Sequence, residues 1–147
     1  MEVPPVQVET RDEAMTVIQR ELTTFARRAR AAAARLHPRL SLVSATLLTH
    51  VAEHPGCRAA DLAAHYLLDK STISRQVAAL ERLGLVERRT AEDDHRAQVL
   101  HLTPAGAEVL ADYVTARRQA FEQRLAGWSE EDLRRFAICL TRYNDGF

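Results

Sequence analysis

The spacing of apolar residues changes abruptly near the middle of the chain, from a helical period to the short runs typical of strands. Residues 70–83 carry apolar side chains on one helical face and polar side chains on the other. Asp69 is a favourable N-cap for this helix, and Gly84 provides its C-terminal stop. Residues 85–89 and 98–102 favour strands and flank a polar stretch, which predicts a β-hairpin with a charged tip directly after the helix.

Helices are expected on both sides of this segment, because only five glycines and five prolines interrupt the 147 residues. Pro38 interrupts one helical pattern, and Thr103-Pro104 opens another. The further helices are predicted at residues 11–36, 40–53, 58–66, 104–126 and 133–143. Two short helices, a tight connection, a polar-faced helix and a hairpin make a winged helix-turn-helix. The predicted fold is therefore mainly α with a small β-hairpin wing.

Composition and charge restrict the function. The 20 Lys and Arg residues balance 20 Asp and Glu residues, so any site for a polyanion must be local. The longest uncharged stretch, residues 40–52, is shorter than the roughly 18 residues that a membrane span needs. The acidic N-terminal region lacks the apolar run of a secretory signal, so a cytoplasmic protein is expected. No glycine-rich phosphate loop, G-x-S-x-G motif or carboxylate pair is present, so neither an enzyme nor a cofactor is expected.

The polar face of the helix at residues 70–83 has the chemistry of a DNA-reading surface, provided that its apolar face is buried. The predicted buried residues are Ile73, Val77 and Leu80, and the predicted DNA-binding residues are Lys70, Ser71, Thr72, Ser74 and Arg75, with Ala78 also facing out. The basic side chains can bond phosphates or guanine edges, and the hydroxyls can bond phosphates or either base type. The helix N-terminus also favours a phosphate. Taken alone, this pattern fits equally well an ordinary capped amphipathic helix whose polar face contacts only solvent.

Two motifs, DKSTISRQVAALERLGLVERR at residues 69–89 and DHRAQVLHLTPAG at residues 94–106, carry a resemblance to a known family. This is the multiple-antibiotic-resistance regulator (MarR) family of bacterial transcription factors. The first motif is similar to the family's recognition helix and first wing strand. The second motif is similar to its Asp-x-Arg wing tip, second wing strand and Leu-Thr-x-x-Gly helix start. With the flanking helices, the resemblance covers nearly the whole chain from about Arg11.

The resemblance implies a homodimer whose intertwined terminal helices present two winged domains to a pseudo-palindromic operator in double-stranded DNA. In a single domain at residues 1–147, residues 11–36 and 104–147 would form the dimerisation helices and residues 40–103 the DNA-binding part. The predicted helix at residues 104–126 supports a dimer, since a domain this small cannot bury all of its apolar side chains. The expected function is a sequence-specific, ligand-responsive repressor.

The resemblance also places Arg96 in the adjacent minor groove, with Asp94 as a bidentate partner of its guanidinium. The alternative is a wing-tip ion pair without a DNA role. Residues 58–96 contain seven basic and seven acidic side chains, so binding must depend on arrangement, with Lys70, Arg75, Arg88 and Arg96 on the DNA side. This neutral balance also supports a second function, a winged-helix module for protein–protein interaction.

The resemblance further implies a small aromatic or anionic effector in a cleft between the dimer helices and the winged part. His37, Arg39 and Thr46 are the candidate residues for this cleft, and they are equally consistent with ordinary surface and helix-packing roles.

The chain departs from the family pattern at two turns. Leu67 stands where a glycine usually turns between the third and fourth helices, so this turn is expected to differ. Arg58 stands where Ser or Thr commonly caps the third helix, which puts the first turn of that helix in doubt and offers an additional phosphate contact.

A metal- or thiol-sensing regulator is a further alternative. His50, Glu53 and His54 have a spacing that can bring imidazoles to one metal, but helix-end histidines also suit the helix dipole, and no metal is expected. Cys57 lies next to Arg58, which could lower the pKa of its thiol. Packing as a small hydrophobic residue is favoured for Cys57 and for Cys139.

Overall fold

The computed structural model describes residues 6–146, so residues 1–5 and residue 147 of the predicted domain lie outside the described part. Within it the chain forms six helices and one two-stranded antiparallel sheet. The elements are α1 (Arg11–Leu36), α2 (Leu42–Glu53), α3 (Ala59–His65), α4 (Lys70–Arg82), β1 (Val86–Thr90), β2 (Gln98–Leu102), α5 (Pro104–Leu125) and α6 (Glu130–Asn144). The predicted fold class is confirmed. In the described range, no helix is both long enough and apolar enough to cross a membrane.

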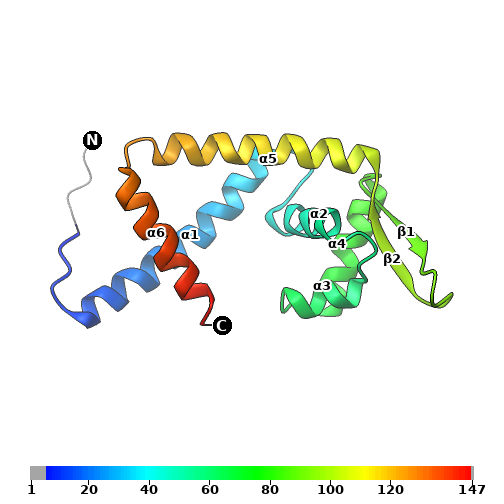
Figure 1. The fold of residues 1–147 in the computed structure, drawn as a ribbon, viewed down its shortest axis with the longest axis horizontal. Helices are drawn as coiled ribbons and strands as arrows, with labels where there is room; N and C mark the ends of the chain where they lie inside the picture. Colours follow the sequence, from blue (N-terminus) through cyan, green and yellow to red (C-terminus); the bar gives the residue numbers. More distant parts are fainter. Residues whose placement is uncertain (1–5, 147) are drawn as a thin grey trace.

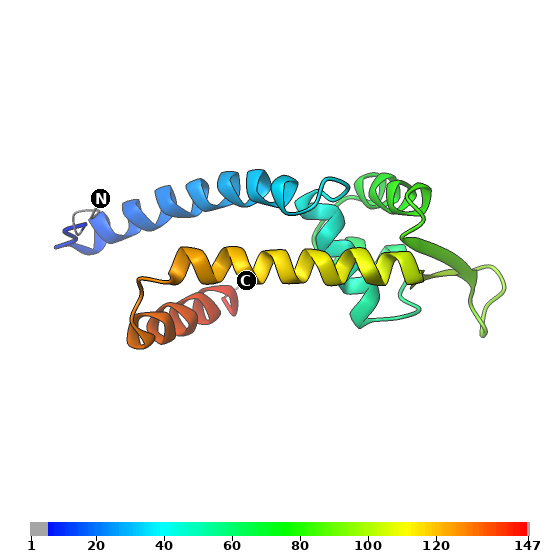
Figure 2. The ribbon, with the colours of Figure 1, turned by 90° about the horizontal axis from the view of Figure 1, so that it is seen from above.

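The short elements form one compact end of the molecule, and the long helices extend away from it. Helices α2, α3 and α4 pack together with the hairpin, whereas α1 and α5 run outward and α6 turns back from the far end of α5 (Figure 1). Seen from above, α5 lies between α1 and α6 (Figure 2). The largest fully buried side chains are Leu47, Leu48, Val51, Leu62, Ile73, Val77, Leu80, Leu85 and Leu100. The hydrophobic core therefore belongs to the winged part, which holds α4 in place.

Local capping signals explain where most helices begin. Asp69 caps α4 and Thr103 caps α5 with proline in the first turn, as predicted. Helix α2 begins two residues later than expected, because Ser41 is its N-cap and Ser44 completes a capping box. Helix α6 begins three residues earlier than expected, because Ser129 is its N-cap and the acidic residues lie inside its first turn.

The hairpin is joined to the helical part by backbone hydrogen bonds. Strands β1 and β2 pair with Val86 opposite Leu102 and Thr90 opposite Gln98. The loop after α2 adds a short bridge, in which Gly56 N–H donates to the carbonyl of Leu100 at 2.9 Å and Leu100 N–H donates to the carbonyl of Cys57 at 2.8 Å. The wing is thus fixed at its base, while its tip projects from the molecule (Figure 1).

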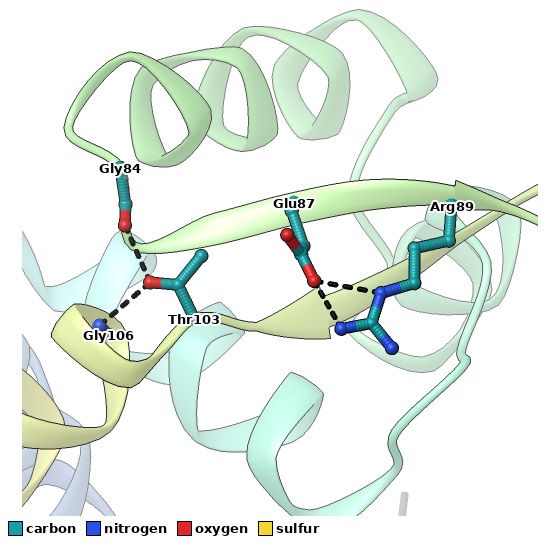
Figure 3. A network of polar contacts seen from close by, with 5 residues as sticks. All are labelled: Gly84, Glu87, Arg89, Thr103 and Gly106. Carbon is teal, nitrogen blue, oxygen red and sulfur yellow. Dashed lines mark hydrogen bonds and ion pairs between the residues drawn. The ribbon is translucent and has the colours of Figure 1, made fainter.

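A polar contact locks the corner where β2 enters α5. The Thr103 hydroxyl donates to the carbonyl of Gly84 at 2.5 Å and accepts the N–H of Gly106 at 3.0 Å (Figure 3). Gly106 lies against the start of β1 so closely that a Cβ there would stand 2.0 Å from the carbonyl oxygen of Leu85. This close approach explains why only glycine fits at position 106.

Leu67 retains the left-handed turn that a glycine would normally make. Its φ is +52°, and its side chain is 92% exposed, so the strained backbone gains no packing in return. The turn between α3 and α4 therefore has the positive φ that glycine favours, although leucine occupies the position.

The Leu67→Gly variant is expected to be more stable than the Leu67→Ala variant by about 1 kcal/mol, because only glycine adopts positive φ without steric cost. Thermal unfolding followed by circular dichroism measures the difference. Both variants remove the exposed leucine side chain equally, so equal melting temperatures would show that the turn is unstrained.

Candidate nucleic-acid interface

The two faces of α4 differ as predicted. Ile73, Val77 and Leu80 are buried on the core side. The outer face carries the exposed residues Lys70, Ser71, Ser74 and Arg75, with Thr72 half-buried beside them. Ala78, expected to face out, is half-buried. The core therefore determines which side of α4 another molecule can reach.

Asp69 organises the first turn of α4. One carboxylate oxygen accepts the N–H of Thr72 at 2.7 Å and the hydroxyl of Ser71, and the other accepts the hydroxyl of Thr72 at 2.9 Å. Hydrogen bonds from the Ser71 hydroxyl, the Thr72 amide and the Thr72 hydroxyl lower the pKa of Asp69 to about 2, with Arg75 adding to the effect. Asp69 is consequently a carboxylate at neutral pH.

The two basic side chains of this face form no close ion pair among the described residues. Arg75 donates only a long hydrogen bond, 3.4 Å, to the hydroxyl of Thr72. Within the described residues, neither Lys70 nor Arg75 takes part in an ion pair. Both cations therefore remain available to an anionic partner.

The wing tip is built differently from the expected ion pair. Asp94 accepts the backbone N–H of Arg96 at 3.0 Å, and its own carbonyl accepts the N–H of Ala97 at 3.0 Å. No ion pair joins the two side chains in this described loop, so Asp94 shapes the turn and does not hold the guanidinium. The Arg96 side chain is exposed. This corrects both the bidentate pairing and the alternative of a wing-tip ion pair.

The other arginines near the wing are partnered. Arg88 of β1 forms an ion pair with Glu81 of α4. Figure 3 shows a second ion pair, between Arg89 and Glu87 on the same strand. The Arg58 guanidinium is 3.9 Å from Asp93, and Asp61 accepts the backbone N–H of Arg58 in place of a side-chain cap. Arg88 thus connects α4 to the wing and, unlike Lys70 and Arg75, already has a carboxylate partner.

The candidate effector residues are used in local contacts. His37 Nδ1 accepts the N–H of Arg39 at 3.2 Å, and the Thr46 hydroxyl donates to the carbonyl of Leu42 at 2.8 Å. Two surface pockets of the described residues lie elsewhere, one beside the hairpin and one on α6, and neither is lined by His37, Arg39 or Thr46.

The environment of Cys57 is not that of a sensing thiol. Burial and the nearby Asp61 raise the pKa of the Cys57 thiol, which is the opposite of the lowering that Arg58 suggested. Cys57 packs against the core, as favoured from the sequence. Cys139 is exposed on α6 in the single chain and does not pack within it.

A cluster of aromatic rings joins α2 to α3. His50 is buried, stacks on His54 with 4.3 Å between ring centroids, and shares a 3.1 Å hydrogen bond with the Tyr66 hydroxyl. His65 lies 5.1 Å from His50. In the described part of the chain no group of three or more His, Cys, Asp or Glu is arranged to hold a metal ion. The spacing of His50 and His54 indicates from the sequence that these two rings lie together. It does not indicate their partners His65 and Tyr66, which lie at the end of α3.

This cluster is expected to make the stability of the protein depend on pH. Burial lowers the pKa of His50, and the neighbouring His54 and His65 lower it further, against the opposite effect of Glu53 and Asp61. The unfolded chain then binds this proton more readily than the folded one. Stability should therefore be undiminished above the ordinary histidine pKa of about 6.5 and fall as the pH drops below it.

The His50→Asn variant tests this dependence, because an amide replaces the ring nitrogen that bonds Tyr66 and does not titrate. We expect the melting temperature of the unsubstituted protein to fall more between about pH 7 and pH 5 than that of the variant. Parallel melting curves at all pH values would mean that His50 does not couple folding to protonation.

Comparisons with known proteins agree with this geometry. A family model described as MarR family matches residues 40–97. The uncharacterized HTH-type transcriptional regulator YxaD of Bacillus subtilis is 35% identical over 133 residues, which cover 89% of this chain and 93% of that protein. A putative transcriptional regulatory protein for the hcr operon of Thauera aromatica is 36% identical over 83 residues, covering 54% of this chain and 50% of that protein.

Solved structures share the fold along most of the chain. A probable transcriptional regulator from Pseudomonas aeruginosa is 27% identical with a TM-score of 0.75, covering 86% of this chain and 96% of that one. The MarR family transcription regulator SP03579 has a TM-score of 0.80 at 24% identity, and the match covers 92% of each chain. At this identity the similarity supports the fold of this chain and not its function.

A winged helix-turn-helix with an exposed cationic face on α4 and a projecting wing defines the class of DNA-binding transcriptional regulators. Within that class, the chain belongs to the MarR family.

Proposed function

We propose that this regulator is a repressor that binds a pseudo-palindromic operator as a homodimer, through α4 and the wing of each subunit. The observation that carries the proposal is the pair of cations on α4, Lys70 and Arg75, which are exposed and form no ion pair in the described chain. Such side chains bond phosphates and guanine edges in the major groove.

The long helices support a dimer. None of the side chains of α6, all of them in the described range, is buried, although the helix carries several large apolar residues. Apolar side chains exposed by 41% or more on the long helices and the α5–α6 turn are Met15, Ile18, Phe25, Val114, Phe121, Trp128, Phe136, Ile138, Leu140 and Tyr143. A second copy of the chain would cover this surface, and MarR regulators typically bind DNA as dimers.

The residues have different roles in this proposal. Lys70 and Arg75 bind phosphates or guanine, Ser74 adds a hydroxyl, and Arg96 enters the minor groove beside the wing. Arg88 contributes by tying β1 to α4 through Glu81, and Asp94 contributes by shaping the backbone that presents Arg96. A small aromatic or anionic molecule that binds between the dimer helices and the winged part, near His37, Arg39 and Thr46, would release the operator.

The neutral charge of residues 58–96 favours a second candidate, a protein-interaction module that uses the same face. Selection of bound duplexes from a random DNA library separates the two functions, with anisotropy titrations of the winner and a scrambled duplex at several salt concentrations. The repressor proposal predicts an enriched palindrome and a large specificity ratio. Weak, salt-sensitive binding without enrichment would favour the protein-interaction module.

A further inference from the structure

The direction of the hydrogen bonds at the start of α4 restricts what its hydroxyl groups can bind. A serine hydroxyl has a single proton, and the Ser71 hydroxyl donates it to the carboxylate of Asp69. The carboxylate cannot return a proton, because an ionised Asp only accepts hydrogen bonds. Ser71 is exposed, so the part of its oxygen that faces outward carries lone pairs alone.

The neighbouring hydroxyls show that this restriction is selective. The Thr72 hydroxyl also donates to Asp69, at 2.9 Å, and in addition accepts from Arg75 at 3.4 Å. Within the described chain Ser74 has no hydrogen bond from its hydroxyl, so it can donate or accept. The outer face of α4 therefore combines donors at Lys70, Ser74 and Arg75 with an acceptor at Ser71.

We infer that Ser71 selects an amino base, adenine or cytosine, over a keto base on the contacted DNA strand, and that Asp69 is the positioning residue that makes it an acceptor. Adenine N6 and cytosine N4 are the donors in the major groove, whereas guanine O6 and N7, thymine O4 and every phosphate oxygen are acceptors. This inference rests on the proposed function, because it assigns a base preference to the same DNA-binding face.

The strength of the Asp69 contact supports this assignment. A hydrogen bond to a carboxylate is roughly twice as strong as one between neutral groups. If the Ser71 hydroxyl donated to a DNA phosphate, it would lose its hydrogen bond to the Asp69 carboxylate and gain one to another anion. The phosphate would then also lie close to the negative charge of Asp69, which is unfavourable. An amino group of a base requires no such exchange, since Asp69 keeps its proton donors.

The experiment is operator selection with the full-length protein and three variants. Ser71→Ala removes the acceptor. Asp69→Gly removes the carboxylate while glycine remains a tolerated N-cap, so the Ser71 hydroxyl can rotate and donate. Thr23→Ala is the matched control, because it deletes a hydroxyl that lies on α1, outside the DNA-reading face, where it donates to the carbonyl of Gln19. Thermal unfolding checks that each variant folds.

The unsubstituted protein is expected to select A or C on one strand at one base pair of each half-site, by about tenfold over G or T, which is the value of one good hydrogen bond. Ser71→Ala and Asp69→Gly should both lose this preference at the same base pair, and Thr23→Ala should keep it. Because the readout is a base preference, a change in overall affinity or stability does not imitate it.

Retention of the preference in Ser71→Ala, or selection of a keto base at the sensitive position, would overturn the inference while leaving the operator-binding function intact. Retention in Asp69→Gly alone would overturn the role of Asp69. Failure of the unsubstituted protein to select any operator would overturn the proposed function together with this inference, so the two failures are distinguishable.

Discussion

Replacing Gly106 by alanine is expected to lower the melting temperature by about 10 °C or to prevent folding, corresponding to about 3 kcal/mol or more. The added Cβ would stand 2.0 Å from the carbonyl oxygen of Leu85 and 2.9 Å from its carbonyl carbon. Backbone atoms cannot rotate away as a flexible side chain does, so α5 and the start of β1 would have to separate. Thermal unfolding followed by circular dichroism measures the effect.

The matched control is Gly127→Ala, at the turn after α5, where an added Cβ meets no atom within 4 Å. This variant is expected to melt at the temperature of the unsubstituted protein. If Gly106→Ala also melted at the temperature of the unsubstituted protein, Gly106 could not lie as close to the Leu85 carbonyl as described.

The second large effect concerns DNA. Arg75→Ala and Arg96→Ala are each expected to weaken operator binding by about ten- to 100-fold, because a good arginine contact to a base contributes about 1–3 kcal/mol. The two side chains are exposed and outside the hydrophobic core, so the dimer and its melting temperature should be unchanged. Anisotropy titrations with the selected operator measure binding. Sedimentation measures the dimer, and thermal unfolding measures the melting temperature.

Arg20→Ala provides a control with the same loss of charge. Arg20 lies on α1, where it pairs with Glu21 at 3.1 Å, and exposed pairs of this kind contribute little to stability. Its removal should leave operator binding nearly unchanged. Undiminished binding by both Arg75→Ala and Arg96→Ala would refute the assignment of the DNA-binding residues.

The elements of the fold were predictable because their signals are local. Asp69 and Gly84 bound α4, and Thr103-Pro104 opens α5, so a few neighbouring residues decide each boundary. Helix α6 begins three residues before its predicted start, because the acidic residues after Ser129 belong to its first turn and not to its cap. The buried and exposed faces of α4 follow from its period alone, which is why Ile73 and Arg75 were assigned correctly to opposite sides.

The partners of the charged residues were not predictable in the same way. Arg88 pairs with Glu81, seven residues earlier, because the hairpin lies against the end of α4. The Asp94 carboxylate accepts a hydrogen bond from the backbone N–H of Arg96, whereas the predicted partner was the Arg96 guanidinium. These contacts depend on how the chain turns between the residues. The spacing of apolar residues in the sequence does not predict those turns.

The sequence by itself determined the class of fold, the order of its elements and the residues available on the DNA-reading face, because helix caps and apolar spacing act over a few residues. Only the tertiary structure decided how those residues are used. It placed Leu85 against Gly106, brought His65 and Tyr66 to His50, and directed the Ser71 proton toward Asp69. Each of these depends on the distance and direction between side chains or backbone segments, and packing of the whole domain sets that geometry.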